Sequence, residues 1–162
     1  MLKRKRFPDY DAYPIVFLYR HAFELSIKNI IYRSVRLIAL RELKDISEKL
    51  YNTHDLIKLA ENVRMILLKA YPDDDSLHKF VQDVVSASRE FSEIDPASFS
   101  YRYPIDAKGN CSNREGQSIN LSSLSGHMKD ILEELDTISF GLNIETDNAE
   151  EVYEVYIASR NL

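Results

Sequence analysis

The segment YRHAFELSIK, residues 19–28, decides the fold because it combines large apolar side chains with one charged stripe. It lies in an apolar stretch, residues 13–40, whose only proline is Pro14. Proline suits a first helical turn, because its missing N–H would have no partner there. The stretch therefore predicts a long helix. Its apolar residues cover most of the helix circumference, which is typical of a helix at the centre of a fold.

The charged stripe of this helix consists of Arg20, Glu24 and Lys28, four residues apart, with His21 beside it. Residues at this spacing share one helix face. One interpretation is a solvated face, where each pair stabilises the helix by only about 0.2–0.5 kcal/mol. The other is a polar cleft lined by basic groups, a carboxylate and an imidazole. The sequence leaves both open.

The helical pattern continues to about residue 51, and we expect a turn or kink within 34–45, because one unbroken helix of that length is unusual in a small domain. A second helix should start with Thr53 as its cap and Asp55 in its first turn. It should end at Tyr71, since the residue before Pro72 disfavours the helical conformation. The acidic residues 73–75 predict the start of a third helix, which residues 95–96 close.

The last large helix should be capped by Ser122 or Ser123 and end at Gly141, where a glycine cap is expected. Residues 96–120 lack a helical pattern, and alternation over 99–103 predicts a short extended segment. The chain thus divides into an irregular arm (1–12), a bundle domain (13–143) and an acidic tail (144–162) with a short helix around 152–157. The predicted fold is all-α, an up-and-down bundle of four to five helices with a long irregular loop.

The composition of the 162 residues is that of a globular protein, with a net charge of −5 at pH 7. A single cysteine, Cys111, excludes an internal disulfide and a cysteine-based metal site, and indicates a reducing compartment, here the cytoplasm. No apolar run is long enough to span a membrane. The acidic pI of about 5.4 disfavours tight non-specific binding of nucleic acid, although a local basic patch remains compatible with it.

The candidates for proton transfer are His21, in the first helix, and His54, at the start of the second. If these helices pack antiparallel, His54 approaches the charged stripe. No histidine spacing matches a zinc site, no serine or cysteine has a nucleophile signature, and no phosphate-binding glycine loop occurs. We therefore expect neither a metal nor a cofactor.

Several motifs in this order resemble HEPN-like bacterial helical-bundle proteins of an uncharacterised subgroup. They are YRHxFEL at 19–25, HDLIKL at 54–59, DPAS at 95–98 and YRYP at 101–104. The resemblance implies a bundle of four or five helices, often a homodimer. It also implies binding of RNA or a nucleotide, or ribonuclease activity, in bacterial or phage defence.

The nuclease members of that family carry an arginine and a histidine with four to six residues between them. Here the nearest match is Lys49 followed by His54, and lysine lacks the planar fork of arginine that binds phosphate at two points. The resemblance places Lys49 and His54 as catalytic candidates. It groups the ligand-binding candidates around one cleft: Arg20, His21, Glu24, Lys28, Asp55 and Arg102.

Three functions follow as hypotheses. The first is a HEPN-like domain that binds RNA or a nucleotide. The second is a metal-independent HEPN ribonuclease that uses His54 for proton transfer. The third is a structural or partner-binding helical module in which the charged residues form an ion-pair network that fixes helix register. Whether the protein is an enzyme is left open by the sequence.

Overall fold

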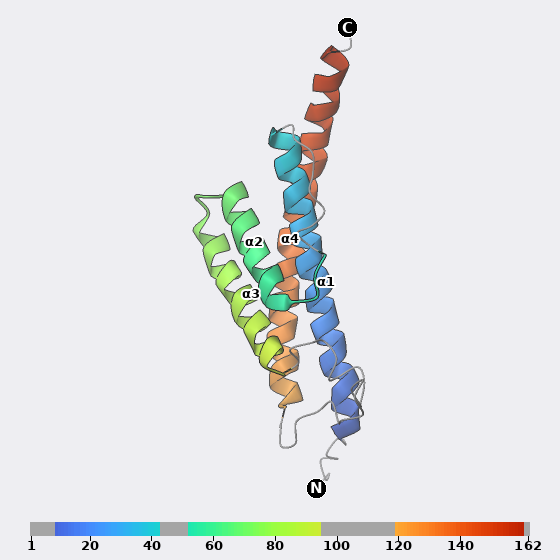
Figure 1. The fold of residues 1–162 in the computed structure, drawn as a ribbon, viewed down its shortest axis with the longest axis vertical. Helices are drawn as coiled ribbons and strands as arrows, with labels where there is room; N and C mark the ends of the chain where they lie inside the picture. The colour runs from blue at the N-terminus through green and yellow to red at the C-terminus, as the bar shows by residue number, and fades with distance from the viewer. Residues whose placement is uncertain (1–8, 43–51, 95–118, 161–162) are drawn as a thin grey trace.

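The computed structural model describes residues 9–42, 52–94 and 119–160, which form four helices and no strand (Figure 1). The helices are α1 (Asp9–Glu42), α2 (Leu56–Ala70), α3 (Asp75–Ile94) and α4 (Leu121–Arg160). The predicted all-α bundle is confirmed, with four helices in the described part. The expected extended segment at 99–103 lies outside the described residues, as does nearly all of the predicted loop.

Three of the helices run in the same direction. The hydroxyls of Tyr19 and Ser125 are 2.8 Å apart, and Asn29 donates to Ser139 at 2.7 Å, so α1 and α4 advance together. The same parallel relation holds between α1 and α2, whereas α3 turns back after the short connection at 71–74. The directions therefore do not alternate strictly, as they would in a simple up-and-down bundle.

The N-terminus of α2 is capped by Asp55, and not by Thr53 as predicted. The Oδ1 atom of Asp55 accepts the backbone N–H groups of Ile57 at 3.1 Å and Lys58 at 3.2 Å. Thr53 lies two residues further out and accepts the N–H of Asp55 itself at 3.2 Å. A carboxylate at this position satisfies two amide groups that have no partner within the helix.

The other two described caps follow the same chemistry. The predicted cap of α3 within 73–75 is Asp74, which accepts the N–H groups of Ser76 and Leu77. For α4 the predicted cap, Ser122 or Ser123, was wrong by two or three residues. Asn120 is the cap, and its side-chain oxygen accepts the N–H groups of Ser122 and Ser123, both at 3.1 Å.

Helix α1 is longer at its start than the pattern suggested. It begins at Asp9, so residues 9–12 are helical and Pro14 lies inside the helix, in its second turn. The helix continues unbroken to Glu42, so no turn interrupts it between residues 34 and 42. The remaining positions of the predicted turn lie outside the described residues.

Helix α4 does not end at Gly141, and the predicted separate tail helix is wrong. The helix runs without a break through Gly141 to Arg160. Its continuation is held by side chains of α1, because a basic half of α1 lies beside an acidic half of α4. The pairs are Arg33–Asn143, Arg41–Glu145 and Arg36–Glu150. These long-range contacts override the local tendency of glycine to end a helix.

Replacing Gly141 by alanine is expected to raise the free energy of unfolding by about 1 kcal/mol, because alanine is the better helix former in a helix interior. The added Cβ atom would meet nothing within 4 Å. Urea denaturation followed by circular dichroism measures the change. A helix that ended in a left-handed glycine cap would be destabilised by the same substitution, so a loss of stability would contradict the continuous helix.

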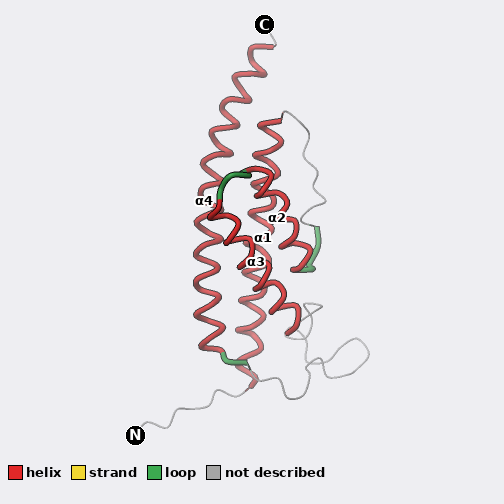
Figure 2. Tube along the Cα trace, turned by 90° about the vertical axis from the view of Figure 1, so that its left-hand side faces the viewer, coloured by secondary structure: helices red, strands yellow, loops and turns green. Residues whose placement is uncertain are grey.

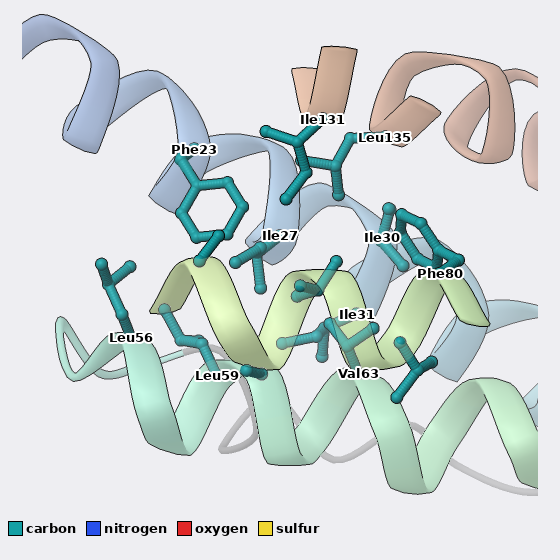
Figure 3. Packing of buried hydrophobic residues seen from close by; sticks show 14 of the residues in the cluster. Phe23, Ile27, Ile30, Ile31, Leu56, Leu59, Val63, Phe80, Ile131 and Leu135 are labelled. Carbon is teal, nitrogen blue, oxygen red and sulfur yellow. The ribbon is translucent and has the colours of Figure 1, made fainter. Parts of the chain in front are cut away.

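The hydrophobic core lies where one side of α1 packs against the other three helices. The prediction of a central helix is met only in part, because Leu18, Leu25 and Tyr32 leave the opposite side of α1 exposed. Figure 3 shows side chains of all four helices meeting there. The buried residues labelled in it are Phe23, Ile27, Ile30, Ile31, Leu56, Leu59, Val63, Phe80, Ile131 and Leu135. The ring of Phe23 also packs on Phe91 of α3, with 5.8 Å between centroids.

The C-terminal turns of α4 leave the bundle. Figure 1 and Figure 2 both show α4 continuing past the end of α1. Residues 151–160 are all exposed. None of the described helices has a stretch that is long and apolar enough to cross a membrane.

Candidate functional site

The carboxylate of Glu24 is the centre of a polar network that joins α1 to the residues before α2. Its Oε2 atom accepts a hydrogen bond from Arg20 at 3.0 Å. Its Oε1 atom is 2.9 Å from the Lys28 ammonium and 2.7 Å from Nδ1 of His54. Arg20 also donates to the backbone carbonyl of His54 at 3.1 Å. One buried carboxylate thus binds three basic side chains.

Burial separates this network into an inner and an outer part. The side chains of Arg20 and Glu24 are both only 3% exposed, whereas that of Lys28 is 21% and that of His54 81% exposed. The solvated-face interpretation of the stripe is therefore wrong for Arg20 and Glu24. The periodicity of α1 could not reveal this, because burial depends on where α2 lies.

The pKa of Glu24 is lowered from its ordinary value. Burial alone would raise it, since a desolvated carboxylate is disfavoured. The hydrogen bonds and charges of Lys28 and His54 act in the opposite direction and together outweigh burial. Glu24 is therefore an anion near neutral pH, and its charge is more than balanced by Arg20 and Lys28.

The network orients the imidazole of His54. Because Nδ1 faces Glu24 and the side chain is mostly exposed, Nε2 is the nitrogen that is turned to solvent. A neutral ring that donates its Nδ1 proton to a carboxylate presents the lone pair of Nε2. This arrangement can accept a proton from a bound molecule, or donate one when the ring is charged.

The lowered pKa of Glu24 predicts a pH-dependent stability. The ionised carboxylate stabilises the folded state above the ordinary pKa of 4.5, and this stabilisation is lost as the pH falls through the lower folded value. In urea denaturation, the stability difference between the native protein and Glu24→Gln should be largest near neutral pH. It should narrow below that ordinary pKa. A difference that does not change with pH would contradict the role of the charge.

The remaining predicted site residues lie elsewhere or outside the described part of the chain. The ring of His21 is exposed and stacks on Phe17, with 5.8 Å between centroids, and no bond joining it to Glu24 or His54 occurs in the described part.

Asp55 caps α2, as described above, and its Oδ2 atom lies 3.3 Å from Nζ of Lys58. Backbone hydrogen bonding at the helix start, chiefly from Lys58, lowers the pKa of Asp55. Lys49 and Arg102 lie outside the described residues.

A second cluster was missed by the sequence analysis. Tyr71, the C-cap residue of α2, lies close enough to Glu145 of α4 to interact with its charge, while the guanidinium of Arg41 lies 5.7 Å from the centroid of the tyrosine ring. Burial and the neighbouring Glu145 raise the pKa of Tyr71 to about 12. Its three members come from three helices, so no spacing within one helix could have indicated it.

A shallow groove between α1 and α4 was also missed. It is lined mainly by polar side chains: Asn29, Arg33, Asp136, Thr137, Ser139, Phe140 and Asn143. The distribution of charged residues along the sequence could have indicated that these two helices pack together. Residues 25–41 contain four basic and no acidic side chains, whereas residues 145–160 contain five acidic and one basic side chain. This asymmetry favours packing of the two segments against each other.

The described part of the chain is an all-α arrangement of four helices in which a buried carboxylate holds a lysine and a histidine at the surface. The described residues contain no group of three or more side chains that could hold a metal ion. No protein-family model, curated protein or solved structure matches the chain.

Proposed function

We propose that this protein is a HEPN-like domain that binds RNA or a nucleotide, at the surface formed by Lys28 and His54. The observation that carries the proposal is that buried Glu24 holds both of these basic groups on one oxygen atom. From the resemblance described above, we also propose that the protein is a homodimer and acts in bacterial or phage defence.

The charge of the network supports an anionic ligand. Glu24 contributes one negative charge, and Arg20 and Lys28 contribute two positive charges, so the cluster is positive even with a neutral His54. A phosphate that approaches Lys28 meets a donor that Glu24 already orients, and His54 adds a second donor at Nε2 when its ring is protonated, so little ordering remains for binding to impose. The overall charge of −5 limits this attraction to a local patch.

The second form of this proposal is a metal-independent ribonuclease. The specific observation in its favour is the Glu24–His54 pair, in which a carboxylate fixes the ring and leaves Nε2 exposed. In such a reaction Nε2 takes the proton of a ribose 2′-hydroxyl, whose oxygen attacks the adjacent phosphorus. The 5′-oxygen leaves and takes a proton from water, and the other product is a 2′,3′-cyclic phosphate. General base catalysis of this kind contributes about 10²–10⁴-fold to a rate.

The competing function is a structural or partner-binding module, and its supporting observation is the burial of Arg20 and Glu24. Arg20 joins Glu24 to the backbone of His54, which fixes where α2 begins relative to α1. A network with this role stabilises the fold and needs no ligand.

Binding and cleavage of a short fluorescent RNA, measured in EDTA at low and high salt, distinguish these functions. We expect the native protein to bind RNA more weakly as salt rises, because binding to phosphates releases counterions. Lys28→Gln should weaken binding about tenfold, the effect of losing one charge-assisted bond of about 1.4 kcal/mol. His54→Ala should lower any cleavage rate at least about 100-fold.

The matched controls are His78→Ala and Lys79→Gln, which change the same residue types at exposed positions of α3. Both should bind and cleave RNA as the native protein does. The thermal midpoint of each variant shows whether it is folded. Absence of RNA and nucleotide binding by the folded native protein would remove the first two functions and leave the structural module.

A further inference from the structure

The surface of the Glu24 network carries two basic groups that differ in what they present to a ligand. Nζ of Lys28 and Nδ1 of His54 bond the same oxygen, Oε1, at 2.9 and 2.7 Å. The two nitrogens are therefore no further apart than these two distances combined. An ammonium group only donates, whereas Nε2 of an imidazole donates when the ring is charged and accepts when it is neutral.

The net charge of the network depends on His54. One carboxylate lies among Arg20, Lys28 and, when its ring is charged, His54. The cluster thus has one net positive charge with a neutral ring and two with a charged ring. Asp55, the next residue, lies 3.3 Å from the ammonium of Lys58, so this pair adds little to the balance.

A phosphate monoester matches both the donors and the charge of this surface. Its second ionisation lies at about pH 6, so near neutral pH it carries one or two negative charges. Either a charged His54 donates from Nε2 to the dianion, or a neutral His54 accepts the proton of the monoanion. In both forms one proton lies between Nε2 and a phosphate oxygen, while Lys28 donates to a second oxygen of the same group.

A phosphodiester inside an RNA chain lacks this property. It has a single negative charge and no proton to give, so a neutral His54 offers it only a lone pair. The diester then bonds Lys28 alone. The surface therefore favours a phosphate at the end of a chain over the phosphates within it.

We propose that the surface formed by Lys28 and His54 recognises a phosphate monoester, either the terminal phosphate of an RNA or that of a mononucleotide. This assignment rests on the function proposed above and narrows it to one chemical class of ligand. His54 determines the specificity, because its ring exchanges a proton with the ligand, whereas Lys28 binds a monoester and a diester alike. The imidazole is mostly exposed, so a phosphate reaches it directly from solvent.

Two oligoribonucleotides of one sequence, with a 5′-phosphate or a 5′-hydroxyl, test the specificity at fixed salt. The native protein should bind the phosphorylated form about tenfold more tightly, the effect of one additional charge-assisted bond. His54→Gln should bind both forms equally, because an amide exchanges no proton with phosphate. Lys28→Gln should weaken the binding of both. His78→Gln, at an exposed position of α3, is the matched control and should keep the native preference.

A second measurement needs no RNA. Methyl phosphate is a monoester and dimethyl phosphate a diester, and neither contains a base or a ribose. In an NMR titration, methyl phosphate should shift the imidazole resonance of His54, which is assigned by its absence in His54→Gln. Dimethyl phosphate at the same concentration should leave this resonance in place, and equal shifts by the two compounds would overturn the proposal.

Competition by adenosine 5′-monophosphate against the phosphorylated RNA distinguishes the two sources of the monoester. Equal affinities would support a mononucleotide as the ligand, and a much weaker monophosphate would support an RNA end.

Equal binding of the two RNA forms by the native protein would overturn the proposal and retain the RNA-binding function. A preference that persists in His54→Gln would also overturn it, because general attraction to the added charge would then explain the preference. If methyl phosphate binds and neither RNA does, the monoester site is retained and the RNA function fails. The thermal midpoint of each variant verifies that it is folded.

Discussion

Replacing Glu24 by alanine is expected to lower the free energy of unfolding by about 3–5 kcal/mol, the cost of leaving a buried charge without its partner. The carboxylate is 3% exposed and bonds Arg20, Lys28 and His54. Its loss leaves the guanidinium of Arg20 buried beside an apolar methyl group. Urea denaturation near neutral pH measures the effect.

Two further variants test whether the loss of stability in Glu24→Ala comes from the buried network. Glu133→Ala removes an exposed glutamate of α4 and should change stability by no more than about 0.5 kcal/mol. The double variant Arg20→Leu with Glu24→Leu should recover most of the stability, since apolar residues of similar volume often replace a buried ion pair without net cost. A single Glu24→Ala variant as stable as Glu133→Ala would show that the network does not stabilise the fold.

The double variant also separates structure from function. If the network serves only to stabilise the fold, this variant should fold as the native protein does and show the same behaviour toward RNA. If the network presents Lys28 and His54 to a phosphate, the variant should fold and fail to bind RNA. The comparison therefore decides between the two proposed roles without relying on a destabilised protein.

Replacing Phe23 by alanine is expected to lower the free energy of unfolding by about 3–5 kcal/mol, because it removes one of the two largest fully buried side chains of the core. Phe23 is fully buried and packs on Phe91, so α1 and α3 would lose contact across the cavity. The same denaturation measurement applies. Binding of a small aromatic molecule to the cavity should recover part of the loss.

Leu25→Ala is the matched control for Phe23→Ala, since it shortens an apolar side chain only two residues away on the same helix. Leu25 is about half exposed, so its truncation should change stability by about 0.5 kcal/mol or less. Equal effects at the two positions would contradict the burial of the Phe23 side of α1 against the other helices.

Much of the fold was predictable because it depends on short-range patterns. The core residues of α2 and α3 follow from apolar spacing, and the ends of these helices follow from Tyr71-Pro72 and from Asp74. The errors occurred where distant contacts override local preference. Gly141 is a favourable helix end, yet bonds from α1 hold the next turns of α4 in place.

The candidate site was predictable only in part. The sequence by itself determined that Arg20, Glu24 and Lys28 share one face of a helix, because residues four apart are neighbours in any α-helix. It also determined the apolar faces, for the same reason. Only the tertiary structure decided that Arg20 and Glu24 are buried, that His54 joins them across 30 residues, and that α1, α2 and α4 run in parallel. Burial and long-range pairing depend on how whole helices pack, and no local spacing encodes that.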